Sequence, residues 1–261
     1  MLTKEAIQEQ LREMGILPSD TVLVHTSLKA LGPVEGGADG LIDAFQGYLT
    51  EGMFLVPTHT WATVNQPPHV YDVNETVPCI GTLPRVAAFR KDGIRSLHPT
   101  HSIWGWGKDA EAFLQGEEKA QTPAAPGGAW DRLADAGAKI LLIGVGLDKN
   151  TFIHSVEEVA KIPDRLKEEA YNITVLDQNG QATVHPYHRH FCSRSRDVSM
   201  QYVNFEKPLL YYGAMTFGRL GNAQVRIVDA AKCKQVLLDI FVKADRDLCI
   251  EKMEIPEEFY Q

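Results

Sequence analysis

The chain has 261 residues, of which 44% are hydrophobic and 23% charged, and its formal net charge is −8. These values are ordinary for a globular enzyme and argue against nucleic acid as the main partner, because phosphate binding needs clustered Lys and Arg. No apolar run approaches the ~20 residues of a membrane span, and the four cysteines form no C-x-x-C pair, so we expect reduced thiols in the cytoplasm.

The first half of the chain alternates helix-like and strand-like segments. Residues 4–14 follow a threonine N-cap and place their apolar side chains on one face, which predicts a helix and not a signal peptide. The β-rich runs 21–28 and 52–58 predict strands buried on both faces, with a helix over 36–49 between them. Residues 61–80 are polar and rich in proline, which predicts a long irregular loop.

The alternation continues through the middle of the chain. Residues 83–93 predict a helix closed by a glycine, and 95–107 predict the approach to a strand. Residues 129–137 predict another helix, and 139–146 predict a third buried strand. A further helix, which carries His154, follows at once.

The last third of the chain changes to paired strands. Residues 172–187 predict a hairpin, in which Asn179 and the glycine after it suit a type I′ turn. Residues 214–228 predict a second strand pair, and 229–244 predict a closing helix. Together the segments predict a single α/β domain over 1–261, a three-layer α/β/α sandwich with a mixed central sheet and late β-hairpins.

Polar segments follow three of the predicted strands, where ligands gather in open α/β sheets. They are 25–37, 58–61 and 144–154. The first forms a glycine-rich turn before a helix, a geometry that lets a backbone approach a ligand or simply connects a strand to a helix. The turn contains Thr26, Ser27 and Gly32.

His154 and Glu157 lie three positions apart in a predicted helix, and so share one face. The carboxylate could orient the imidazole and stabilise its protonated form, which leaves the second ring nitrogen as a general base. An ordinary surface ion pair would show the same spacing. The place of the pair beyond a strand end favours a functional role.

Residues 95–102 combine a cation, hydroxyls and histidines, which suits recognition of a phosphate. The candidates for binding are Arg95, Ser96, His98 and Ser102. The histidines of this segment could instead satisfy buried backbone carbonyls.

A later cluster holds His185, His188, His190 and Cys192. It could bind zinc, but no second Cys/His pair completes a tetrahedral set. We therefore expect no metal, and we interpret His188 and His190, which would point the same way on a strand, as partly catalytic and partly structural.

Five segments, in this order, resemble the antibiotic N-acetyltransferase family, that of the aminoglycoside 3-N-acetyltransferases. They are VHTSLKALGPVEGGADGLIDAF, GMFLVPTHT, GTLPRVAAFRKDGIRSLHPTHSIWGWGKDAEAF, KILLIGVGLDKNTFIHSVEE and GRLGNAQVRIV. The resemblance implies acetyl-CoA as cosubstrate, an aminoglycoside amine as acceptor, and antibiotic resistance as the outcome. It implies that the pantetheine and pyrophosphate of CoA are contacted by Thr26, Ser27, Leu28 and Gly32. It also implies that Arg95 and Ser96 lie near the CoA phosphates.

His154 matches the active-site histidine of the T-x-x-H-x-x-E motif of that family, with Glu157 beside it. We expect His154 to deprotonate the acceptor amine while Glu157, His188 or His190 orients it. The hairpin strand departs from the acidic pattern of the family, since it carries histidines and Arg189. Alternative functions are N-acetylation of a non-antibiotic metabolite amine, a metallohydrolase built on the histidines, or CoA binding without catalysis; a homodimer is compatible with each.

Overall fold

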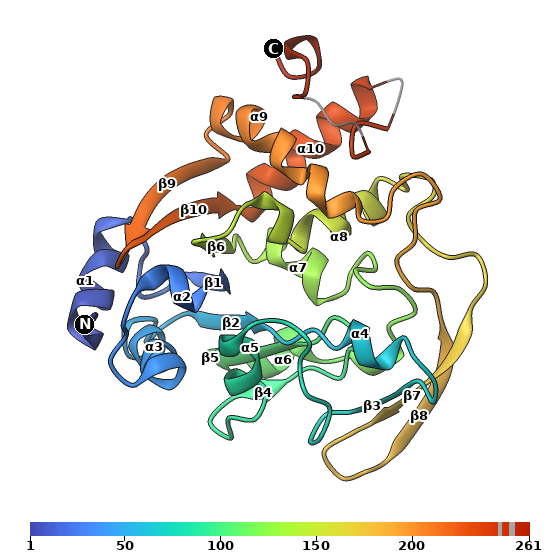
Figure 1. The fold of residues 1–261 in the computed structure, drawn as a ribbon, viewed down its shortest axis with the longest axis horizontal. Coiled ribbons are helices and arrows are strands. Elements are labelled where there is room, and N and C mark those ends of the chain that lie inside the picture. The colour runs from blue at the N-terminus through green and yellow to red at the C-terminus, as the bar shows by residue number, and fades with distance from the viewer. Residues whose placement is uncertain (245–246, 251–253) are drawn as a thin grey trace.

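A seven-stranded mixed sheet forms the centre of the protein (Figure 1), in a computed structural model that describes residues 1–244, 247–250 and 254–261. Strands β1, β2 and β6 run parallel to one another, whereas the strands outside them are antiparallel to their neighbours. The order across the sheet is β4 (Ile94–Arg95), β5 (Ile103–Gly107), β2 (Met53–Pro57), β1 (Thr21–Thr26), β6 (Lys139–Ile143), β10 (Ala223–Asp229) and β9 (Met215–Leu220).

Helices cover both faces of this sheet. Helices α1 (Lys4–Glu13), α3 (Gly37–Tyr48) and α5 (Thr82–Ala87) bury their apolar side chains with one face. Helices α7 (Ala129–Asp135), α8 (Phe152–Val159) and α10 (Ala230–Lys243) pack on the other.

Successive residues of β1 alternate between these two cores, with Val22 and Val24 in one and Leu23 in the other. This alternation follows from the period of two of a strand. The three-layer α/β/α arrangement with a mixed sheet is confirmed, as is the burial of the central strands on both faces.

Some of the predicted helix ends agree with the structure and others do not. Thr3 caps α1 as expected, because its hydroxyl accepts from the Ala6 backbone N–H. The helix predicted over 83–93 ends early, at Ala87. Gly93, predicted to close that helix, instead directly precedes β4 and lies so close to the ring of Trp104 that an added Cβ would fall 2.3 Å from it, so no larger residue fits there.

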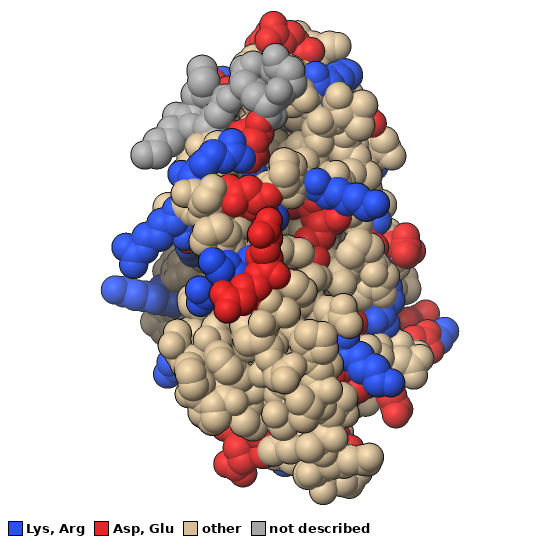
Figure 2. All heavy atoms as spheres, turned by 90° about the vertical axis from the view of Figure 1, so that its right-hand side faces the viewer, with Lys and Arg blue, Asp and Glu red and all other residues tan. Residues whose placement is uncertain are grey.

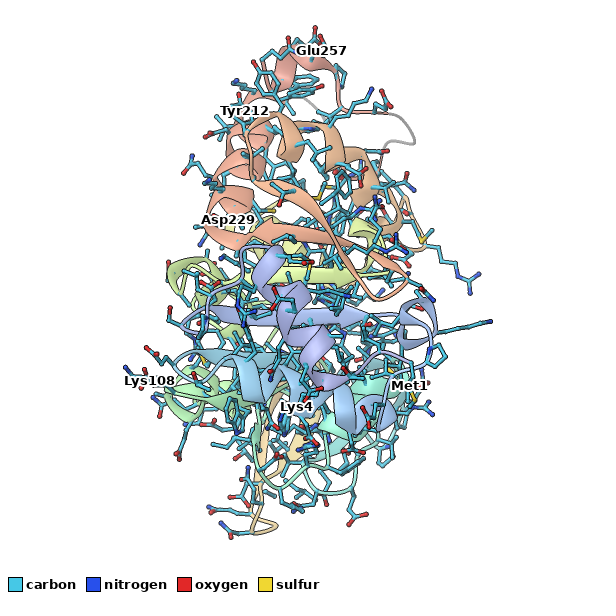
Figure 3. The ribbon with its side chains drawn as sticks, turned by 90° about the vertical axis from the view of Figure 1, so that its left-hand side faces the viewer. Met1, Lys4, Lys108, Tyr212, Asp229 and Glu257 are labelled. Carbon is cyan, nitrogen blue, oxygen red and sulfur yellow. The ribbon has the colours of Figure 1, made fainter. Side chains whose placement is uncertain are left out.

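Short helices make up most of the connections. The remaining ones are α2 (Leu28–Leu31), α4 (Trp61–Val64), α6 (Ala110–Leu114), η1 (Glu117–Lys119), η2 (Leu147–Lys149), η3 (Val198–Phe205), α9 (Glu206–Tyr211) and η4 (Glu257–Phe259), where η marks a 3₁₀ helix. In Figure 3, α1 crosses in front of the strands, and Asp229 lies where β10 ends and α10 begins. The Asp229 carboxylate caps α10 by accepting from the Lys232 backbone N–H at 3.0 Å.

A second, three-stranded sheet lies beside the central one, at the lower right of Figure 1. Strands β7 (Tyr171–Leu176) and β8 (Ala182–Tyr187) form the predicted hairpin, and β3 (Val70–Asp72) pairs parallel to β7. The prediction of an irregular loop over 61–80 is thus wrong, since it contains α4 and β3. The type I′ turn is also wrong, because Gly180 has a positive φ whereas Asn179 does not.

In the part of the chain that the structure describes, no helix is long and apolar enough to span a bilayer. All four cysteines are free thiols, as expected.

Candidate active site

A cavity of about 980 Å³ opens where β1, β2 and β6 end, and we call it the His154 cavity. The parallel strands bring their carboxyl ends to one rim, and the polar segments that follow them line it. Its lining includes Thr26, Ser27, His59, Asn150, Thr151 and His154. The predicted convergence of the three segments is therefore observed.

The His154 imidazole is held through one nitrogen. Nδ1 lies 3.1 Å from Glu157 Oε2 and 2.6 Å from the hydroxyl of Tyr202, on η3. The Tyr202 hydroxyl also donates to Glu157. Because a carboxylate only accepts, Nδ1 carries the proton, and Nε2 presents a lone pair with no partner among the described residues.

Glu157 is ionised despite its burial. Desolvation opposes the charge, but the hydrogen bond with His154, the Arg165 guanidinium and the Tyr202 hydroxyl bring its pKa from 4.5 down to about 2. Arg165 Nε donates to Glu157 at 2.5 Å, and its Nη2 donates to Asp247 at 2.6 Å. The chain thus supplies a buried anion behind the imidazole, which suits a base that becomes positively charged during the reaction.

Four further histidines surround this pair. The His190 ring lies 4.1 Å from that of His154 and 5.3 Å from that of His101, which in turn lies 4.7 Å from His59. Burial lowers the pKa of His25 to about 3 and holds the pKa values of His59, His101 and His190 well below 6.5. These imidazoles are therefore neutral at neutral pH.

Unpartnered polar atoms concentrate at the same cavity. Within residues 1–244, 247–250 and 254–261, eight buried side-chain polar atoms have no hydrogen-bond partner, and six of these belong to lining residues. They are His25 Nε2, Thr26 Oγ1, His59 Nε2, His190 Nε2 and both amide atoms of Asn150. Buried polar groups normally find partners, so this concentration indicates a site shaped for a polar ligand.

The residues predicted to bind CoA divide into two groups. Thr26 and Ser27 line the cavity, and the Ser27 backbone N–H donates to the Ile143 carbonyl at 2.9 Å. Leu28 is partly buried against the core at the start of α2. Gly32 ends α2 with φ +82°, where an added Cβ would meet the Asn222 side chain at 2.6 Å, so this glycine is needed for packing.

Arg95 does not reach the cavity. Its guanidinium is buried and donates to the carbonyls of Thr58, Val73 and Thr76 and to the hydroxyls of Thr58 and Ser102. Because these acceptors inside the fold already engage all three nitrogens of the guanidinium group, few N–H donors remain for a phosphate.

The other candidates of this segment are also committed to the fold. The Ser96 hydroxyl accepts from the Ile103 backbone N–H, and the Ser102 hydroxyl donates to the Thr58 carbonyl. His98 accepts two backbone N–H groups on Nδ1, and its Nε2 binds the Thr122 carbonyl. It borders a separate cavity of about 200 Å³.

His188 and His190 do not act as a pair. Strand β8 ends at Tyr187, so the alternation of strand side chains does not extend to them. His188 Nδ1 binds the Lys167 carbonyl at 2.9 Å outside the lining, whereas His190 lies against His154. In the part of the chain that the structure describes, no group of three or more His, Cys, Asp or Glu side chains could hold a metal ion.

Several residues of the site were not predicted. His25 and His59 lie at predicted strand ends, so their position was a usable signal. Tyr202 and Arg165 reach Glu157 from 45 and 8 positions away through tertiary packing, and no local pattern marks them. Asn150 precedes the helix that carries His154, where an asparagine would ordinarily be read as a turn residue.

Comparisons with known proteins agree with this architecture. A family model described as aminoglycoside 3-N-acetyltransferase matches residues 23–241. An aminoglycoside N(3)-acetyltransferase III from Serratia marcescens is 30% identical over 198 residues, which cover 69% of this chain and 73% of that protein.

Solved structures share the fold. The structure named AAC-IIIb binary with CoASH has a TM-score of 0.77 at 22% identity and covers 90% of this chain and 94% of that one. The apoenzyme of aminoglycoside acetyltransferase AAC(3)-IVa has a TM-score of 0.75 at 23% identity, with 90% and 86% covered. On the family match and the Serratia relative, the chain belongs to the aminoglycoside 3-N-acetyltransferase family.

Proposed function

We propose that the protein transfers the acetyl group of acetyl-CoA to an amino group of a small-molecule acceptor, with His154 as general base. The observation that carries this proposal is the free Nε2 of an imidazole whose Nδ1 is anchored to a buried carboxylate, in a cavity lined with unpartnered polar atoms. The family match supplies the reaction class.

The chain's own groups account for each proton. Acetyl-CoA, when bound, supplies an acetyl thioester. His154 Nε2 takes a proton from the acceptor nitrogen as the C–N bond forms, and Glu157 offsets the positive charge that the ring acquires. The proton then passes to the departing thiolate as the C–S bond breaks. Asn150 Nδ2 and the Thr26 hydroxyl are free donors that can stabilise the oxyanion.

The names of the relatives give one acceptor class, the 3-amino group of an aminoglycoside. With such an acceptor, the cellular outcome we propose is antibiotic resistance. A second class, a non-antibiotic metabolite amine, is favoured by the charges of the cavity. We place the reaction in the cytoplasm, where acetyl-CoA and reduced thiols coexist.

Thiol release from acetyl-CoA, measured with purified protein and a panel of amines, tests this function. His154→Ala should lower kcat on the order of 10²–10⁴-fold with the fold intact. His185→Ala, the same change on β8 outside the cavity lining, should leave kcat within about twofold. A His154→Ala enzyme within a few-fold of the wild type would refute the role of the base.

A further inference from the structure

The cations that line the His154 cavity differ in whether they are already neutralised. Lys149 Nζ lies 2.9 Å from Asp148, and Arg165 is shared between Glu157 and Asp247. Arg189 and Arg196 also line the cavity, yet their guanidinium groups have no ion pair or hydrogen bond with the described residues. Both side chains are exposed, so they stand at the rim in reach of a ligand.

The lining has two carboxylates, and one of them, Asp197, has no cation partner among the described residues. Asp148 is paired with Lys149. Asp197 caps η3, since it accepts from the Ser199 backbone N–H at 3.1 Å and from the Ser199 hydroxyl at 2.7 Å. Figure 2, which views the molecule from the side of β7 and β8, shows cationic and anionic groups intermixed and no broad acidic face.

Inside the cavity, burial keeps the imidazoles of His25, His59 and His101 uncharged, and the charge of Arg165 is offset by Glu157 and Asp247. An acceptor with several ammonium groups would lose hydration there with Asp197 as its one unpaired lining carboxylate, and it would approach two unpaired guanidinium groups. An acceptor with an anionic group would instead gain charge-assisted hydrogen bonds at the rim.

The lining residues come from different parts of the fold. Thr26 ends β1 in the middle of the central sheet and Ser27 follows it, whereas Arg189 and Arg196 follow β8 of the small sheet (Figure 1). His154 lies in the lining of the same cavity. A ligand with its amine at His154 and an anion at the arginines would leave the residues at the end of β1 for the acetyl donor.

We propose that the acceptor is a small amine that also carries a phosphate or carboxylate group, which Arg189 and Arg196 hold while its amino group lies at His154. This specificity rests on the proposed N-acetyl transfer and narrows its substrate class. The phosphates of CoA share the same chemistry, so the experiment must separate the two sources of the anion.

Matched pairs of amines provide the test: glucosamine with glucosamine 6-phosphate, ethanolamine with phosphoethanolamine, and gentamicin as the polycation. In thiol-release assays the phosphorylated member of a pair should show a kcat/KM at least tenfold above its parent and above gentamicin. The double variant Arg189→Ala with Arg196→Ala should reduce that preference to within about threefold and leave the KM for acetyl-CoA unchanged. Arg12→Ala removes an exposed charge on α1, which lies on the opposite side of the molecule from β8 (Figure 1), and should change neither.

Three results would overturn the specificity. One is a wild-type enzyme that prefers gentamicin. Another is a double variant that keeps the preference while its KM for acetyl-CoA rises severalfold, which would assign the arginines to the CoA phosphates. Absence of thiol release with every amine would overturn the proposed function itself and this inference with it.

Discussion

Replacing Glu157 by glutamine removes one buried charge at nearly constant volume. In the folded protein the pKa of Glu157 is about 2 instead of 4.5, although burial alone would raise it. A carboxylate with a lowered pKa contributes stability that is complete above its unfolded pKa and is lost as the pH falls through the folded one. The difference between 4.5 and about 2 corresponds to ~3 kcal/mol at pH 7 and to only ~1 kcal/mol at pH 3.

Urea unfolding of wild type and Glu157→Gln at several pH values measures this contribution. The gap between the two unfolding free energies should be largest near pH 7 and should narrow below pH 4. Activity should also fall, on the order of 10²-fold in kcat, because the protonated His154 loses its counter-charge.

Glu158→Gln is the matched control, since Glu158 is the next residue and binds Thr122 and the Ala124 backbone N–H. Burial raises the pKa of Glu158. The difference in unfolding free energy between the wild type and Glu158→Gln should therefore change with pH in the direction opposite to that for Glu157→Gln. If Glu157→Gln matches the wild type in stability at pH 7, or if its gap does not depend on pH, the assignment of Glu157 as a buried anion is wrong.

Three further substitutions test other contacts. Tyr202→Phe removes the hydroxyl that donates to Glu157. The unfolding free energy in urea should fall by ~1 kcal/mol and kcat by about tenfold. An unchanged kcat would contradict this. Arg95→Ala leaves the Val73 and Thr76 carbonyls without their donor, whereas the Thr58 carbonyl keeps the Ser102 hydroxyl. The change should cost ~3 kcal/mol in unfolding free energy while the KM for acetyl-CoA stays within about twofold, and a tenfold rise in that KM would restore the predicted phosphate contact. Asn150→Ala removes an amide that has no partner among the described residues. The free energy of unfolding should therefore change by less than ~1 kcal/mol, while kcat/KM falls at least about tenfold. An unchanged kcat/KM would argue against a ligand contact.

The parts of the fold that depend on local pattern were predictable from the sequence. The apolar runs of β1, β2 and β6 carry their burial in their own residues, and the hairpin β7–β8 joins neighbours along the chain. The pairing of β3 with β7 joins Val70 to Thr174, and no pattern within either strand specifies a partner so distant.

The same distinction explains the site. The spacing of His154 and Glu157 within one helix was a sufficient signal for their contact. Arg95 looked like a phosphate ligand because its residue type and neighbours suit one, but its environment is set by packing against Thr58 and the turn at Thr76. Tyr202 was not predicted, since its hydroxyl meets Glu157 only when η3 folds back over α8.

Asp247 joins two parts of the molecule that the reaction uses separately. One of its oxygens accepts from Arg165, which supports the carboxylate behind His154, and the other accepts from Arg194, which lies in the loop between the two rim arginines. A single residue beyond the last long helix thus tethers both the proton-accepting centre and the loop that would select the acceptor. Any change that displaces this aspartate would therefore alter kcat and the preference among acceptors together.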